Sequence, residues 1–431
     1  MAGAIDQLIG DQRQNRTNIK IRPVSGGASE SVAETLTGLI RNIEADSKAS
    51  NCYDVAFDEM VNGGYGGWRI TTAFNDADFN QSIKFKPINT ATTSLWFDDA
   101  AKEYDKRDAK FAYVTLDMPK EEHKERFPNS PMHEWSQENF NQSGCQAWFG
   151  EGFTRVAEYW VKTPIDKTIA LLSDGRVIDS DEEKAVMDEL AKSGATVVKT
   201  RKVKTHKVEM YLMDGSGILE GPMAWAGKYI PLVPVYGRQA FIENQTYVRG
   251  IVRFAKDANR IYNYETSAMV ETNALTPKDP YWYFPTQNSP FMPYNADAKT
   301  GGGPPTRTGA PSVQQGSLTI LQQMSMDLYH VTGMQPPSIG VNPELKSGKA
   351  ILAQERQGDR GSFIFTDNLI KSIEYSAEIL IDLIPRIYDT AQQVRILQQD
   401  GETKNVEINT INQEVTDEQT GKKVLVNDLS I

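Results

Sequence analysis

The sequence predicts an α+β protein in which short strands alternate with helices in the first half and long helices dominate the second. Residues around 68–74, 111–116 and 154–162 alternate apolar and polar side chains, the period of half-buried strands. From about residue 251 to 275, apolar side chains instead recur with a helical period over roughly 37 Å. Residues 276–316 then hold eight of the 21 prolines, which excludes a long helix there.

Elements of the first half follow from local patterns. A helix end and a strand near Ile19 and Val24 open the chain, and a helix is predicted over 31–62. Ser31, three residues before Glu34, fits a capping box for this helix, and the glycines from 63 to 67 end it. Further elements are strands at 82–87, 94–97 and 196–213, a helix at 179–194, a hairpin turn at 215–221 and an apolar run at 229–237.

The second half continues with helices and ends in strands. A helix is predicted at 317–332, and prolines break the chain between 333 and 347. The next helix extends from Gly348 to about Thr390, with a kink predicted at Pro385. Short strands are then expected at 394–397, 405–408 and 422–426.

Composition narrows the class of protein. The net charge of −11 argues against a generic DNA-binding protein, because clustered Lys and Arg supply most non-specific affinity for phosphate. The two cysteines are too few for a disulfide framework, which fits a reducing compartment. No apolar run approaches a membrane span, and the start of the chain does not resemble a signal peptide.

Motifs for chemistry are weak. The four histidines lack metal-ligand spacing, and SGKAI at 347–351 lacks the first glycine of a phosphate-binding loop. The segment WFDDAAKEYDKRDA concentrates carboxylates that either bind a divalent cation or form a solvated acidic turn: Asp98, Asp99, Asp105 and Asp108. RKVKTHK at 201–207 is either a nucleic-acid patch or one face of an exposed strand. Together they define one alternative hypothesis, a metal-dependent nucleic-acid enzyme.

Charge on the long helix is arranged against its dipole. Arg253, Lys256 and Arg260 lie in its first half, whereas Glu265 and Glu271 lie in its second. Groups outside the helix should compensate for this arrangement. Neighbouring copies in a ring would do so, and pairing within the chain is the other explanation.

Four long strings of the sequence are distinctive: GDQRQNRTNIKIRPVSGGASESVAETLTGLIRNIEADSKA, AFDEMVNGGYGGWRI, LVPVYG and VRFAKDANRIYNYETSAMVE. Together they resemble the portal proteins of P22-like short-tailed bacteriophages. The resemblance implies a subunit of a twelve-membered ring at one capsid vertex, through which DNA is packaged and ejected. It also implies a portal-type fold with an α/β wing at 1–245, stem helices at 246–275 and 317–332, a clip at 276–316, a tunnel loop at 333–347, a long wing helix at 348–392 and C-terminal wing strands at 393–431.

The resemblance also assigns expected sites. Arg253, Lys256, Arg260 and Glu265 would lie at the subunit seam of the stem, and Lys346 and Lys349 would face DNA in the tunnel. The aromatic residues expected to form a docking surface on the clip, rather than to pack on their own wing, are Tyr281, Trp282, Tyr283, Phe284, Phe291 and Tyr294.

Partners and location follow from the same resemblance. The expected partners are other copies of the chain, the terminase large subunit, a head-completion or tail adaptor protein, capsid and scaffolding proteins, and transient double-stranded DNA. Neither a cofactor nor a membrane is expected, and the protein would be found in the virion and, during assembly, in the host cytoplasm. Relative to the family, the chain is expected to be truncated before the usual N-terminal wing segment and after NDLSI, which adds a non-assembling portal remnant as a third hypothesis.

Overall fold

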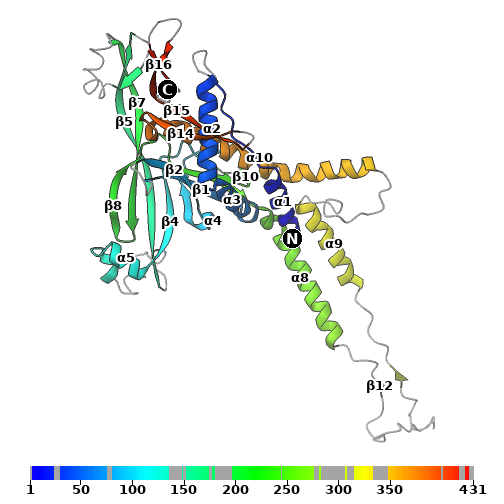
Figure 1. Ribbon diagram of the computed structural model, residues 1–431. Helices are drawn as coiled ribbons and strands as arrows, with labels where there is room; N and C mark the ends of the chain where they lie inside the picture. The colour runs from blue at the N-terminus through cyan, green and yellow to red at the C-terminus, as the bar shows by residue number, and fades with distance from the viewer. Residues whose placement is uncertain are drawn as a thin grey trace, which may run out of the picture. The chain divides into compact units, whose positions relative to one another are not determined.

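The computed structural model describes residues 2–23, 30–74, 80–134, 148, 152–173, 177–179, 197–243, 245–275, 281–282, 306–307, 315–332, 348–398, 401–416 and 423–426. The chain divides into two compact units (Figure 1). Met1–Gln7 with Ile251–Ser362 form the helical unit, and Leu8–Gly250 with Phe363–Ile431 form the body. The mixture of helices and strands confirms the predicted α+β class.

The body is built on antiparallel sheets. One has the strand order β2-β1-β9, and the largest has the order β3-β4-β5-β7-β8 with β6 paired to β5. Their strands are β1 Tyr65–Phe74, β2 Gln81–Pro87, β3 Leu95–Phe97, β4 Phe111–Pro119, β5 Phe153–Leu172, β6 Val177–Asp179, β7 Val197–Asp214, β8 Gly217–Ala224 and β9 Leu232–Tyr236. These bounds confirm the predicted strands and the hairpin turn between β7 and β8.

The N-terminal helices differ from the prediction in two places. The expected helix over 31–62 is two helices, α2 (Glu30–Asp46) and α3 (Ala49–Gly63), because Lys48 has a left-handed φ of 51° between them. The capping box is wrong, since Ser31 lies inside α2, where its carbonyl accepts a hydrogen bond from Thr35 Oγ1 at 2.9 Å. The glycine stop is confirmed: Gly64 has a φ of 94° and its N–H donates to Met60 O.

The strand predicted near Ile19 is absent from the described residues up to 23, which follow α1 (Ala2–Gln14). Ile19 is buried, as its apolar character suggested. The N–H of Ile21 donates to Thr37 Oγ1 on α2 at 3.2 Å rather than to a neighbouring strand. The apolar alternation here therefore reflects packing against a helix.

Strand β1 is the central strand of the three-stranded sheet β2-β1-β9. Helix α3 crosses it so closely that a Cβ at Gly66 would lie 2.1 Å from Ala56 O, which only glycine avoids. Trp68 and Ile70, the next residues on the same face, are fully buried. The glycines that end α3 thus also let β1 pack against it.

Helix α10 (Gly348–Ile387) covers the free edge of β9 with its body segment, which begins at Phe363. Ser372 Oγ donates to Pro234 O at 2.7 Å, and Asn368 Nδ2 donates to Tyr236 O at 2.9 Å. Because an uncovered edge strand leaves backbone groups unpaired, these side chains replace a missing neighbouring strand. Pro385 lies in the last turn of α10.

The remaining elements are short helices and hairpins. In the body they are α4 Ala91–Ser94, α5 Lys120–Arg126, the 3₁₀ helix η1 Pro131–Glu134, and the paired strands β10 Arg238–Ile242 with β11 Gln245–Arg249, β14 Gln392–Leu397 with β15 Thr403–Ile408, and β16 Thr410–Thr416 with β17 Lys423–Val426. The last pairs confirm the predicted C-terminal strands. The helix predicted at 179–194 lies outside the described residues, except for Asp179 in β6.

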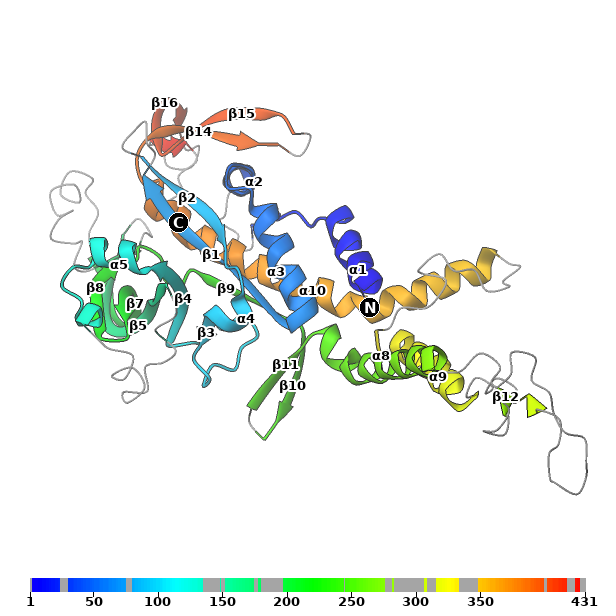
Figure 2. The same cartoon turned by 90° about the horizontal axis from the view of Figure 1, so that it is seen from below.

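The helical unit contains α8 (Ile251–Leu275) and α9 (Gln315–Thr332), which lie side by side (Figures 1 and 2). It also contains a minimal strand pair, β12 (Tyr281–Trp282) with β13 (Thr306–Arg307). The long predicted helix and its successor are therefore both confirmed. Among the described helices, none is long and apolar enough to cross a membrane.

Candidate functional site

The α8–α9 pair has mostly exposed side chains in the described part of the chain. In α8 only Ile251 and Ala255 are buried, and no described side chain of α9 is buried. A helix pair in a globular protein normally buries a continuous apolar stripe. This pair therefore leaves most of its apolar surface available to something else.

One flank of α8 is mainly apolar and exposed. It carries Phe254, Ile261, Tyr264 and Leu275, which fall within roughly 80° of the helix circumference, and the exposed Asp257 lies among them. Tyr264 is 72% exposed and Leu275 is 74% exposed. On helix α9, Leu318 and Met326 are exposed on one side, and Ile320 and Val331 are exposed on the other. Apolar patches of this extent mark surfaces that bind a partner.

A basic flank adjoins the apolar one. Arg253, Lys256 and Arg260 are exposed, and helical spacing places them within roughly 60° of each other. Within the described part of the chain, none of the three forms an ion pair, so the alternative of pairing within the chain is not observed. Glu265 is half-buried and lies across the apolar flank, away from these cations.

The other predicted portal sites fall largely beyond what is described. Tyr281 and Trp282 form β12, where they pair with Arg307 and Thr306, but the placement of their side chains is not described. Lys349 lies in the first turn of α10, and its side chain is likewise not described. The residues that lie wholly outside the described ranges are Tyr283, Phe284, Phe291, Tyr294 and Lys346.

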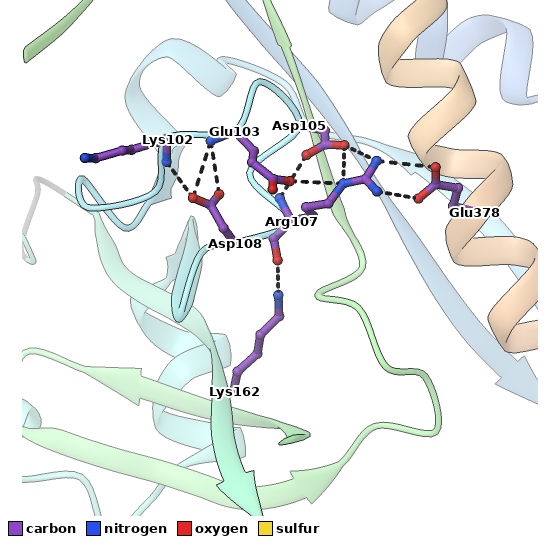
Figure 3. Close-up of polar contacts among 7 residues, drawn as sticks. All are labelled: Lys102, Glu103, Asp105, Arg107, Asp108, Lys162 and Glu378. Carbon is purple, nitrogen blue, oxygen red and sulfur yellow. Dashed lines mark hydrogen bonds and ion pairs between the residues drawn. The ribbon is translucent and has the colours of Figure 1, made fainter. Parts of the chain in front are cut away.

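The acidic segment, for which the sequence left a cation site and a solvated acidic turn open, is a hydrogen-bonded turn. Asp98 is buried and accepts from the N–H groups of Ala100 at 2.9 Å and Lys110 at 3.3 Å. Asp108 accepts from the N–H of Lys102 at 2.6 Å (Figure 3). Asp99 is exposed. Carboxylates used in this way hold the backbone of the turn, as Asp side chains commonly do.

Arg107 fastens this turn to α10. Its guanidinium contacts Asp105 Oδ2 at 2.7 Å through Nε and Glu378 Oε2 at 3.1 Å through Nη1 (Figure 3). The hydrogen bond with Asp105 raises the pKa of Arg107 above its usual value. From the other side, Lys162 Nζ donates to Arg107 O, and burial lowers the pKa of Lys162.

The metal-dependent enzyme hypothesis therefore finds no support in this segment. Among the described residues, no group of three or more His, Cys, Asp or Glu side chains could hold a metal ion. The basic residues at 201–207 lie on β7, which pairs with β5 throughout this stretch, and Lys207 forms an ion pair with Glu209 at 2.7 Å. The exposed-strand explanation of this segment agrees with that pairing.

A buried polar cluster is the feature that the sequence did not reveal. His123 on α5 is fully buried, and its Nε2 lies 3.4 Å from Asp214 Oδ2 at the end of β7. Ser130 Oγ donates to the same oxygen at 2.6 Å, and the His123 and His133 rings lie 5.0 Å apart. No spacing signal joins residues so distant in sequence.

This cluster predicts a pH-dependent stability. Burial lowers the pKa of His123 below its usual value of 6.5, although Asp214 acts in the opposite direction and His133 acts with burial. Below about pH 6.5 this histidine binds a proton more readily in the unfolded chain than in the folded chain. The free energy of unfolding should therefore decrease as the pH is lowered. Between about pH 7.5 and 5.5, urea unfolding should show a larger decrease in the free energy of unfolding for the wild type than for His123→Gln. Substitution of the exposed His330 by glutamine is the control; an unchanged pH dependence in His123→Gln contradicts the assignment.

Comparison with known proteins identifies the family of the chain. The whole chain, residues 1–431, matches the family described as phage P22-like portal protein. The portal protein of Acyrthosiphon pisum secondary endosymbiont phage 1 is 31% identical over 99% of this chain. The chain spans 62% of the length of that relative. The match of the family over every residue shows that the chain belongs to the P22-like phage portal protein family.

Proposed function

We propose that this chain is a structural, non-enzymatic subunit of a homo-oligomeric ring at one vertex of a phage capsid. Double-stranded DNA would enter the head through the ring during packaging and leave through it during ejection. Family membership supports this role, and so does the α8–α9 pair, which has an apolar flank beside a basic flank. A ring of twelve subunits is the expected form.

The parts of the chain take the following proposed roles. Residues 1–245, the helix at 348–392 and the strands at 393–431 would form the wing, which contains most of the body, and α8 and α9 would form the stem. Residues 276–316 would form the clip that docks the terminase large subunit and a head-completion or tail adaptor protein. Capsid and scaffolding proteins would surround the ring, so the protein would occur in the virion and, during assembly, in the host cytoplasm.

Charge suits a conduit for DNA. A net charge of −11 limits phosphate binding, because affinity for duplex rises with the number of phosphates neutralised. Lys346 and Lys349, next to the proposed tunnel loop at 333–347, would supply brief contacts with passing DNA. Weak contacts of this kind would allow the duplex to move.

The observation that carries the proposal is the exposed apolar flank of α8. Only Ile251 and Ala255 of this helix are buried, and neither belongs to that flank. Negative-stain images and sedimentation velocity of the purified chain test it. Closed rings at micromolar concentration are expected. A chain that sediments only as a monomer at high concentration overturns the proposal.

Reversing one charge of the basic flank should weaken the ring. Arg260→Glu places an acid beside Arg253 and Lys256 and removes a cation that a neighbouring copy would pair with. We expect assembly to require about a tenfold higher concentration, or roughly 1.4 kcal/mol per interface. Far-UV circular dichroism should show an unchanged monomer fold, because Arg260 is exposed and makes no ion pair within the described chain.

Arg201→Glu is the matched control for this substitution, since Arg201 is an exposed arginine on β7 of the body. The same change of charge there should leave the sedimentation profile as in the wild type. If Arg260→Glu assembles as readily as Arg201→Glu, Arg260 does not lie at the subunit seam.

A further inference from the structure

The hairpin β10–β11 stands out from the sheets of the body. Its strands pair only with each other in the described chain, with Arg238 opposite Arg249 at the base and Ile242 opposite Gln245 at the tip. Figure 2 shows the hairpin pointing away from the three-stranded sheet. An isolated two-stranded hairpin is at best marginally stable in water. Some other surface should therefore stabilise this one.

The tip of the hairpin is apolar on both faces. Phe241 is 72% exposed, and Ile242 and Tyr247 are 47% and 43% exposed. Ala240 pairs with Tyr247, whereas Phe241 pairs with Thr246, so the Phe241 and Tyr247 side chains project from opposite faces. A tip with apolar side chains on both faces suits insertion into a cleft rather than contact with a flat surface.

The root of the hairpin is fixed to the body by close backbone contacts. Gly237 N donates to Gly64 O at 2.8 Å. A Cβ at Gly250 would lie 2.5 Å from Asn62 O, and one at Gly237 would lie 2.6 Å from Arg249 O. Both ends of the hairpin are therefore held at a fixed place on the body. A fixed root reduces the conformational entropy that the arm loses when its tip binds a partner.

The composition of the arm indicates a protein partner. Between Gln239 and Val248 the only charged residue is Glu243, which is acidic. Nucleic-acid contacts depend on cations for the phosphates, and beyond Arg238 and Arg249 at its base the arm has none. Aromatic and branched apolar side chains are instead typical of the buried centre of protein interfaces.

The position of the arm in the sequence indicates which protein it binds. Gly250 alone separates β11 from α8, so in any ring that joins subunits through α8 the arm begins at the residue next to the seam. Rings are closed by heterologous contacts, in which one patch of a subunit meets a different patch of the next. We propose that the β10–β11 tip inserts into the neighbouring copy of this chain, an inference that rests on the proposed ring.

Matched double variants test the arm in the full chain. Phe241→Ser with Tyr247→Ser removes the apolar tip, and Phe74→Ser with Ile218→Ser removes side chains of similar exposure elsewhere on the body. The tip variant should need at least about a tenfold higher concentration to form rings, because interface residues of this kind dominate binding energy. The control should assemble as the wild type does, and both should retain the circular dichroism of the folded chain.

A cross-linking experiment identifies the occupant directly. A benzophenone side chain in place of Phe241, in rings mixed from isotopically light and heavy chains, should give light-to-heavy cross-linked peptides after irradiation. Cross-links within one chain only, together with normal assembly of the tip variant, overturn the arm and leave the ring proposal standing. Wild-type chain that stays monomeric overturns both.

Discussion

Replacing Trp68 by alanine is expected to lower the free energy of unfolding of the body by about 3–5 kcal/mol. The indole is fully buried at the centre of β1, and Tyr53 meets it edge-on with ring centroids 4.9 Å apart. Its Nε1 donates to Ser376 Oγ on α10 at 3.0 Å. Alanine would leave a cavity between sheet and helix and remove that hydrogen bond.

Two further variants separate these contributions. Trp68→Phe keeps most of the apolar volume and loses the N–H donor, so a smaller loss of about 1–2 kcal/mol is expected. Trp96→Ala is the surface control, because this indole on β3 is about half exposed; less than about 1 kcal/mol is expected there. Urea unfolding followed by far-UV circular dichroism measures all three. Equal losses for Trp68→Ala and Trp96→Ala would contradict the central position of Trp68.

The contact between Trp68 and α10 could not be predicted from the sequence. The strand of Trp68 was predicted from local alternation, and a helix was predicted from Gly348 to about Thr390, but the hydrogen bond that joins them spans 308 positions. The helix does carry a signal for this contact. Asn368, Ser372 and Ser376 recur every four residues and are all buried, which places a polar stripe on an otherwise apolar face. Periodicity alone does not say which backbone groups such a stripe satisfies.

Local patterns predicted α8 and the order of its charges, whereas a subunit seam at these residues stays a prediction. Arg253, Lys256 and Arg260 lie in the first half of α8, as the sequence indicated, and the structure shows them exposed on one flank. Glu265 lies on another side of the helix, because a separation of five residues from Arg260 turns it away from that flank. The break at Lys48 escaped prediction because its left-handed backbone is not typical of lysine. Such a conformation is set by tertiary packing rather than by local preference.

Placing acids on the apolar flank of α8 is expected to abolish the ring. Ile261 and Tyr264 are exposed in the single chain, so Ile261→Asp with Tyr264→Asp should leave the body folded and only modestly weaken α8. In a ring the same flank would be covered, and each carboxylate would lose water without gaining a partner. We expect assembly to weaken at least about a hundredfold, which corresponds to roughly 3 kcal/mol.

Controls distinguish loss of apolar area from burial of charge. Ile261→Ala with Tyr264→Ala removes the side chains without adding charge and should weaken assembly less than the aspartates do. Ile381→Asp places one such charge on an exposed position of α10 in the body and should leave assembly unchanged. Sedimentation velocity across a concentration series compares the three with the wild type. A covered flank tolerates alanine better than aspartate, whereas a solvent-exposed flank tolerates both. Equal assembly of the aspartate and alanine variants would therefore mean that α8 faces water in the ring and that other surfaces hold the subunits together.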